Sequence, residues 1–171
     1  MKIRQATPAD LQDIAEIHVQ SWKDSYTKDL PVEFMAEHID RVLRDHWRAI
    51  SIQKEDIVLV AEEDSPIGFI AIWCRPVPFF IDNLHVKPLY RSKKTGTALM
   101  EAAAEKLLKK GHKTAYLWVF ASNEKAIRFY EKLGGMQKEQ AQIDVFGYEV
   151  LSQKMEWEDL SLIGAKPALQ I

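Results

Sequence analysis

The chain has 171 residues, of which 47% are hydrophobic and 28% are charged, and its formal net charge is −2. This balance is typical of one soluble globular domain and excludes a disordered or fibrous protein. Because the net charge is close to zero, there is no overall basic field to attract nucleic acid or an anionic membrane, and we expect neither as a partner.

The N-terminal third of the chain predicts a short strand and two helices. Residues 2–6 favour the strand, and Thr7 then caps a helix whose first turn accepts Pro8. Apolar side chains recur at helical spacing from there to Trp22. A second helix is expected over residues 31–49, with Phe34, Ile39, Val42, Leu43 and Trp47 as its buried side chains.

The rest of the chain alternates between strands and helices. Its order predicts an α/β fold with a mixed sheet, in which a helix within residues 79–120 connects two parallel strands. Residues 156–171 show no clear period and form a tail without assigned structure, after one domain of residues 1–155. The expected elements are strands at 57–62, 67–74 and 79–86, a helix at 96–110, a strand at 114–120, a helix from the cap Asn123 to Gly134, and a hairpin of strands at 137–143 and 148–156.

A polar loop between a predicted strand and a predicted helix concentrates positive charge. Arg91, Lys93 and Lys94 crowd this turn, and Gly96 and Thr97 leave little side-chain bulk where a backbone approaches a ligand. A helix N-terminus also presents free N–H groups and the positive end of the helix dipole. These features predict a phosphate or pyrophosphate site, although they equally fit a solvated loop with several lysines. The loop matches neither a Walker nor a Rossmann pattern.

The segment LHVKPLYRSKKTGTALM resembles the coenzyme-A-binding signature of the GNAT (Gcn5-related N-acetyltransferase) superfamily. That signature follows a strand and consists of Arg or Gln, two residues, Gly, one residue, and then Gly or Ala. Arg91 and Gly96 match its two ends, and Lys94 stands where the middle glycine is expected. If this position requires a positive φ, a lysine there costs about 1 kcal/mol.

A second motif lies in the next predicted helix. Asn123, Ala126, Phe129, Tyr130 and Gly134 follow the run Asn-x-x-Ala-x-x-Phe-Tyr-x-x-x-Gly that is characteristic of the same family. Asn123 and Tyr130 are two helical turns apart and therefore share a face. Taken alone, Tyr130 would be interpreted as a core aromatic residue; with both motifs in order, a functional role is favoured. The resemblance covers residues 1–155 and is strongest over residues 80–135.

The resemblance implies a mostly antiparallel central sheet with helices on both faces and a splayed pair of parallel strands, between which acetyl-CoA binds by strand addition. It also implies direct attack of an amine on the thioester, with Tyr130 protonating the leaving thiolate. Asp82 is the candidate base, because some family members carry a carboxylate at the matching place; a hydrogen-bonded strand aspartate is an equal interpretation. The residues implied in coenzyme A binding are Leu84, His85, Val86, Arg91, Ser92, Lys93, Lys94, Thr95, Gly96, Thr97, Asn123, Ala126 and Tyr130.

Other candidates for proton transfer or nucleophilic catalysis receive less support. By strand alternation His85 faces away from Asp82 and is expected to be structural. His18 lies on an apolar helix stripe and is expected to be a core histidine. Cys74 is the only cysteine, so it forms no intramolecular disulfide, and it has no activating partner in the sequence. No metal site is expected.

In this family the acceptor is selected by the first two helices, their connection and the last hairpin. This implies Trp22, Tyr26, Trp73 and Phe146 as walls of an acceptor site, where ring faces could hold an organic cation. Core packing is the alternative for each ring. We expect a small amine or amino acid as acceptor; a peptide N-terminus or lysine stays open, as does a non-catalytic acyl-CoA sensor.

The chain ends and hydropathy lead to an expectation about location. The N-terminus lacks the long apolar segment of a secretion signal, and no stretch approaches the roughly 20 apolar residues of a membrane span. We therefore expect a cytoplasmic protein. A homodimer is one assembly that the sequence allows.

Overall fold

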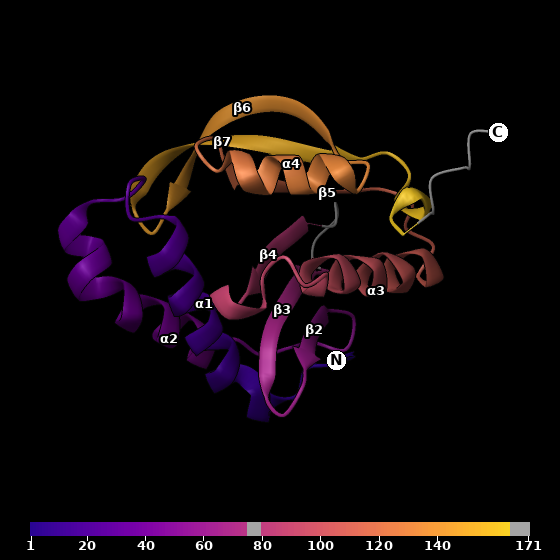
Figure 1. Cartoon of the computed structure of the whole chain (residues 1–171), viewed down its shortest axis with the longest axis horizontal. Coiled ribbons are helices and arrows are strands. Elements are labelled where there is room, and N and C mark those ends of the chain that lie inside the picture. The colour runs from indigo at the N-terminus through magenta and orange to yellow at the C-terminus, as the bar shows by residue number, and fades with distance from the viewer. Residues whose placement is uncertain (75–79, 165–171) are drawn as a thin grey trace.

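Residues 1–74 and 80–164 are described by the structure, a computed structural model, and they contain one seven-stranded sheet. The strand order is β1-β2-β3-β4-β5-β7-β6, and helices cover both faces (Figure 1). The strands are β1 (Lys2–Gln5), β2 (Ile57–Glu62), β3 (Pro66–Trp73), β4 (Phe80–Val86), β5 (Ala115–Phe120), β6 (Met136–Val145) and β7 (Tyr148–Trp157). The helices are α1 (Leu11–Ser25), α2 (Ile39–Ala49), α3 (Thr95–Lys109) and α4 (Glu124–Lys132), with short helical turns η1 (Pro8–Asp10), η2 (Phe34–His38), η3 (Pro88–Tyr90) and η4 (Leu160–Leu162).

The helical turn η1 begins after Thr7, as predicted, but the Thr7 side chain accepts no capping hydrogen bond, and the Asp10 carboxylate makes the contacts at this end. The Asp10 carboxylate accepts a hydrogen bond from the Thr7 backbone N–H at 2.7 Å, which satisfies a free donor at the helix start. Arg4 of β1 donates two further hydrogen bonds to the same carboxylate, at 2.8 and 2.9 Å. The predicted order of elements is confirmed within the described residues, except that the second helix is preceded by a π-helical turn, η2. Phe79, the predicted first residue of β4, lies outside the described residues.

β4 and β5 are the parallel pair of the sheet, as predicted. Their register contains one residue pair, Phe80 with Tyr116, near the start of both strands. The other neighbouring strands of the described sheet pair antiparallel over longer stretches. Because the pairing ends so early, the carboxyl ends of β4 and β5 separate, and their backbone N–H and C=O groups there are available to a ligand.

The sheet separates two hydrophobic layers. On one face α3 and α4 contribute buried side chains such as Leu99 and Ile127. On the other face α1 and α2 contribute Ile14 and Trp47. The helices are therefore on both faces, as expected, and the separated ends of β4 and β5 lie between the two layers (Figure 1).

The C-terminal segment completes the first of these layers. Trp157 at the end of β7 is 1% exposed, and Leu160 and Ile163 beyond it are also buried in the core under α3. Residues 157–164, to which the sequence assigned no structure, are thus part of the packed fold. Residues 165–171 of the predicted tail lie outside the described residues.

Candidate active site

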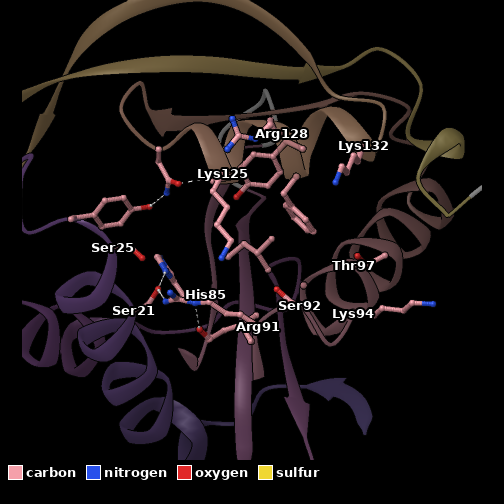
Figure 2. Close-up of a pocket in the computed structure, with 18 residues that line it drawn as sticks. Ser21, Ser25, His85, Arg91, Ser92, Lys94, Thr97, Lys125, Arg128 and Lys132 are labelled. Atoms are coloured by element: carbon pink, nitrogen blue, oxygen red, sulfur yellow. Dashed lines mark hydrogen bonds between the residues drawn. The ribbon is translucent and has the colours of Figure 1, made fainter. Parts of the chain in front are cut away.

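The carboxyl end of β4 borders a cavity of about 470 Å³ (Figure 2). This volume is typical of sites for small organic ligands, roughly 300–1,000 Å³. α1, the loop before α3, the first turn of α3 and α4 form its other walls. Of the residues predicted from the sequence, those lining it are Tyr26, Leu84, His85, Val86, Arg91, Ser92, Lys94, Gly96, Thr97, Asn123, Ala126 and Tyr130; those outside its wall are Trp22, Trp73, Asp82, Lys93, Thr95 and Phe146.

The wall of this cavity is strongly cationic. It carries five Lys or Arg side chains and, within residues 1–74 and 80–164, no carboxylate, although the whole chain has 23 basic and 25 acidic residues. Three of the cations, Lys125, Arg128 and Lys132, are on α4 and were not predicted. Their spacing of three and four residues places them on one helix face, and this spacing was the available signal. Ser21, Ser25 and Phe129 also line the cavity and were not predicted.

The loop before α3 has the backbone shape that its motif implies. Lys94 has a φ of 64° and Ser92 a φ of 60°, so both are left-handed residues without being glycine. The position of Lys94 therefore does require a positive φ. Gly96 allows close packing of α3 against α4, because an added Cβ there would lie 3.3 Å from the Phe129 ring. Lys93 instead lies over the Tyr90 ring, 5.2 Å from its centroid.

Arg91 connects this loop to β4 and α1 through hydrogen bonds and an ion pair. Its Nε donates to the Val86 carbonyl oxygen at 3.1 Å, and its Nη2 donates to Ser21 Oγ at 3.2 Å. Its Nη1 forms an ion pair with Asp24 near the end of α1. The motif arginine thus lines the cavity while holding β4, the loop and α1 in one arrangement (Figure 2).

A pair of neutral histidines supports the inner end of the cavity. His85 Nδ1 lies 2.9 Å from Ser21 Oγ, and its ring stacks on His18 with centroids 4.4 Å apart. Burial, assisted by the Arg91 charge, lowers the pKa of His85 to about 3. Burial also lowers the pKa of His18, whose Nδ1 accepts a hydrogen bond from Trp47 Nε1 at 2.9 Å. Both rings are therefore neutral near pH 7.

Two phenols line the cavity, one from α4 and one from the residue that follows α1. Tyr130 of α4 is 8% exposed, and burial raises its pKa above the ordinary value, so its hydroxyl stays protonated. Tyr26 follows the last residue of α1, and burial raises its pKa as well. Asn123 connects the two walls: its Oδ1 accepts from the Ala126 backbone N–H at 3.1 Å, and its Nδ2 donates to the Tyr26 hydroxyl oxygen at 3.3 Å.

The sequence that forms this loop and cavity matches a known protein family. The model of the Acetyltransferase (GNAT) family matches residues 14–135. The chain belongs to the GNAT acetyltransferase family. It is similar to an uncharacterized N-acetyltransferase of Archaeoglobus fulgidus, with 33% identity over 138 residues that cover 76% of this chain and 89% of the relative. It is also similar to the spermidine N(1)-acetyltransferase of Thermoplasma acidophilum, with 29% identity over 141 residues, or 78% and 87% of the two chains.

A solved structure supports the same assignment. The PaiA N-acetyltransferase of Thermoplasma acidophilum, in complex with coenzyme A, matches with a TM-score of 0.69 and 26% identity over 91% of this chain and 97% of that chain. The protein is an N-acetyltransferase, and acetyl-CoA is its cofactor. The cationic cavity suits this polyanionic group, because it combines a helix N-terminus, five cations and the free strand ends of a GNAT fold. Within the described residues, no helix has the length and apolar character to cross a membrane.

Asp82 of this GNAT protein is an exposed residue at a β-bulge. Its neighbours Ile81 and Asn83 pair with consecutive residues of β3, so Asp82 is the extra residue of the bulge. Its Oδ2 accepts hydrogen bonds from Trp73 Nε1 at 2.8 Å and from Asn83 Nδ2 at 2.9 Å. Because the bulge interrupts alternation, Asp82 contacts Trp73 on the sheet face toward α1 and α2, where His85 also lies. The prediction that the two residues occupy opposite faces is therefore wrong.

The predicted acceptor walls separate into two groups. The Trp22 ring lies 5.4 Å from Tyr26 and 5.7 Å from Phe146, measured between centroids, so these three aromatic residues join α1 to the tip of the β6–β7 hairpin. Trp73 belongs to a different group, 6.3 Å from Trp47. In the GNAT fold described here, the aromatic contacts place the hairpin tip beside the part of the cavity wall formed by Tyr26.

Proposed function

We propose that this GNAT enzyme transfers the acetyl group of acetyl-CoA directly to the primary amine of a small molecule, with cofactor and acceptor bound together. The observation that carries the proposal is that one cavity has both a cation-lined wall and two phenols. A ligand with a phosphate-bearing end and a reactive acyl end matches both parts. When bound, acetyl-CoA supplies the acetyl group as an activated thioester.

The phosphates would be held between α3 and α4. The first turn of α3, at Gly96 and Thr97, offers backbone N–H groups and the positive end of the helix dipole. Lys94, Lys125 and Lys132 add positive charge. No carboxylate of residues 1–74 or 80–164 pairs with these three lysines, so their charge is available to a ligand, and Figure 2 shows Lys125 extending from α4 into the cavity. Arg91 would act mainly by holding the loop.

Tyr130 would return a proton to the sulfur atom that leaves. Its hydroxyl has no hydrogen-bond partner among the described residues, and its ring is fixed by Trp157, with centroids 5.8 Å apart. A raised pKa makes the phenol a weaker acid. However, the same burial raises the pKa of a thiol, since a thiolate is also poorly solvated there. Because both pKa values rise, the transfer stays modestly uphill, as it is for an ordinary phenol and thiolate, and it requires the Tyr130 hydroxyl to be positioned at the sulfur.

An amine must lose a proton before it can attack, and Asp82 remains the proposed base. Its carboxylate is exposed and lies outside the cavity wall. It would therefore accept the proton through water rather than by direct contact, while Trp73 and Asn83 hold it in place. The buried, neutral His85 is a weaker candidate, because its low pKa opposes protonation.

The choice of a small amine as acceptor is supported by a relative that covers most of this chain. The Thermoplasma acidophilum protein at 29% identity is named for the acetylation of spermidine. The aromatic residues Trp22, Tyr26 and Phe146 beside the cavity provide ring faces that attract an organic cation.

The test is an acceptor screen. Primary amines, including polyamines, amino acids and arylalkylamines, are compared with peptides bearing a free N-terminus, and acetyl-CoA-dependent thiol release is measured. We expect the highest kcat/KM with a small amine. A higher kcat/KM for peptides would show that the acceptor is a polypeptide and not a small molecule. Thiol release without any acetylated amine would contradict transfer to an amine.

A further inference from the structure

The cap of α4 fixes the direction of a hydrogen bond in the cavity wall. Asn123 Oδ1 accepts from the Ala126 backbone N–H, which only an oxygen can do, so the amide nitrogen is the atom that faces Tyr26. An amide nitrogen only donates. The Tyr26 hydroxyl oxygen is therefore the acceptor, and its own proton points elsewhere.

The surroundings of Tyr26 indicate where that proton is available. Its ring packs against Phe120 and Trp22, with centroids 4.4 and 5.4 Å away, and neither ring is a conventional hydrogen-bond acceptor. Among the described residues, no atom accepts a hydrogen bond from the Tyr26 hydroxyl. Since Tyr26 lines the cavity, its O–H is free to donate to a bound ligand. Burial raises its pKa, which keeps this donor protonated.

We propose that Tyr26 is a second catalytic residue, whose O–H donates a hydrogen bond to the carbonyl oxygen of the bound thioester as negative charge develops there. A thioester under attack gains charge on oxygen and on sulfur. This inference rests on the proposed function, in which Tyr130 serves the sulfur. The C–N bond forms and the C–S bond breaks, the amine releases one proton, and the sulfur receives one from Tyr130. Tyr26 keeps its proton throughout, and Asn123 is a positioning residue that acts through it.

The first test compares the binding of two ligands. Only acetyl-CoA contains the thioester carbonyl oxygen, so Tyr26→Phe should weaken the binding of acetyl-CoA relative to that of coenzyme A by about fivefold, the scale of one neutral hydrogen bond. Calorimetry gives both Kd values. An unchanged ratio would overturn the proposal. This measurement needs no acceptor, so it is independent of the acceptor screen. If the ratio of the two Kd values changes but the protein acetylates no small amine, the proposed function is contradicted while the role of Tyr26 stands.

The matched variant is Asn123→Asp. Aspartate caps a helix as well as asparagine does, but its carboxylate can only accept hydrogen bonds. The Tyr26 hydroxyl would therefore donate its hydrogen bond to the introduced carboxylate and no longer to a ligand in the cavity. We expect kcat to fall roughly 10²-fold in both single variants, as for other donors to a developing oxyanion. The Tm of Asn123→Asp should stay near that of the wild type. Its added charge affects both ligands alike, so the ratio of their Kd values remains the readout.

The double variant separates positioning from independent action. If Asn123 acts through Tyr26, Tyr26→Phe combined with Asn123→Asp should be no slower than either single variant. Losses that multiply would show that Asn123 acts separately and would overturn its positioning role. A fully active Asn123→Asp protein would do the same. If Tyr26→Phe proves unstable, Asn123→Asp carries the test alone, because it changes no aromatic packing.

Discussion

Replacing Lys94 by glycine should stabilise the protein and weaken cofactor binding at the same time. Lys94 has a φ of 64° and a ψ of 7° immediately before α3. A residue with a Cβ pays roughly 1–2 kcal/mol for this left-handed conformation, whereas glycine costs roughly 0.4–1 kcal/mol more in unfolded-chain entropy. The expected net gain in the free energy of unfolding is about 0.5–1 kcal/mol, which raises the Tm of a chain of this size by roughly 1–4 °C.

The loss of cofactor affinity follows from charge. Lys94 lines the cavity and is exposed, so its removal should weaken coenzyme A binding about two- to fivefold at low salt, and less at high salt. Ser92→Gly is the matched control, because Ser92 has a φ of 60° and lines the same cavity without a charge. It should raise the Tm similarly, and any change in the Kd should be smaller and independent of salt, because no charge is removed. Scanning calorimetry and titration calorimetry at two salt concentrations measure both effects. An unchanged Tm in both variants would refute the strain argument, and equal changes in Kd would refute the charge argument.

Further changes test the remaining roles. Tyr130→Phe should lower kcat by roughly 10²-fold or more with little change in calorimetric coenzyme A affinity; full activity would mean that water protonates the thiolate. Asp82→Asn should move or abolish the acidic limb of the kcat/KM profile, whereas a lower Tm with an unchanged profile would make Asp82 structural. Lys132→Glu should weaken coenzyme A binding roughly tenfold at low salt, and a loss independent of salt would contradict a phosphate contact. Hydrogen bonds from Arg4 lower the pKa of Asp10, so its stabilisation is present above the unfolded pKa of about 4 and is lost as pH falls toward the folded value. Asp10→Asn should therefore cost about 2 kcal/mol in urea unfolding at pH 7 and progressively less below pH 4; a difference that does not depend on pH would contradict this.

The candidate site was predicted where its signals are local. The cap at Asn123 is formed with the residue three positions ahead, and its hydrogen bond to Ala126 is present at 3.1 Å. The glycine missing at Lys94 identified a left-handed position, because φ depends on a residue and its immediate neighbours. The cationic face of α4 was equally readable from its spacing, but Lys125 and Lys132 were not recognised as part of the site.

The sequence alone determined the order of elements, the parallel pair around α3 and the family motifs, because periodicity and capping act within a few residues along the chain. The tertiary structure decided the partners of each side chain. Arg91 pairs with Asp24, 67 positions away, and the β-bulge at Asp82 arises from its register with β3. Likewise, the Asn123 amide reaches the Tyr26 hydroxyl oxygen, 97 positions away, only in the folded chain. Such contacts depend on how elements that are far apart in the sequence pack against one another, and local sequence patterns do not predict that packing.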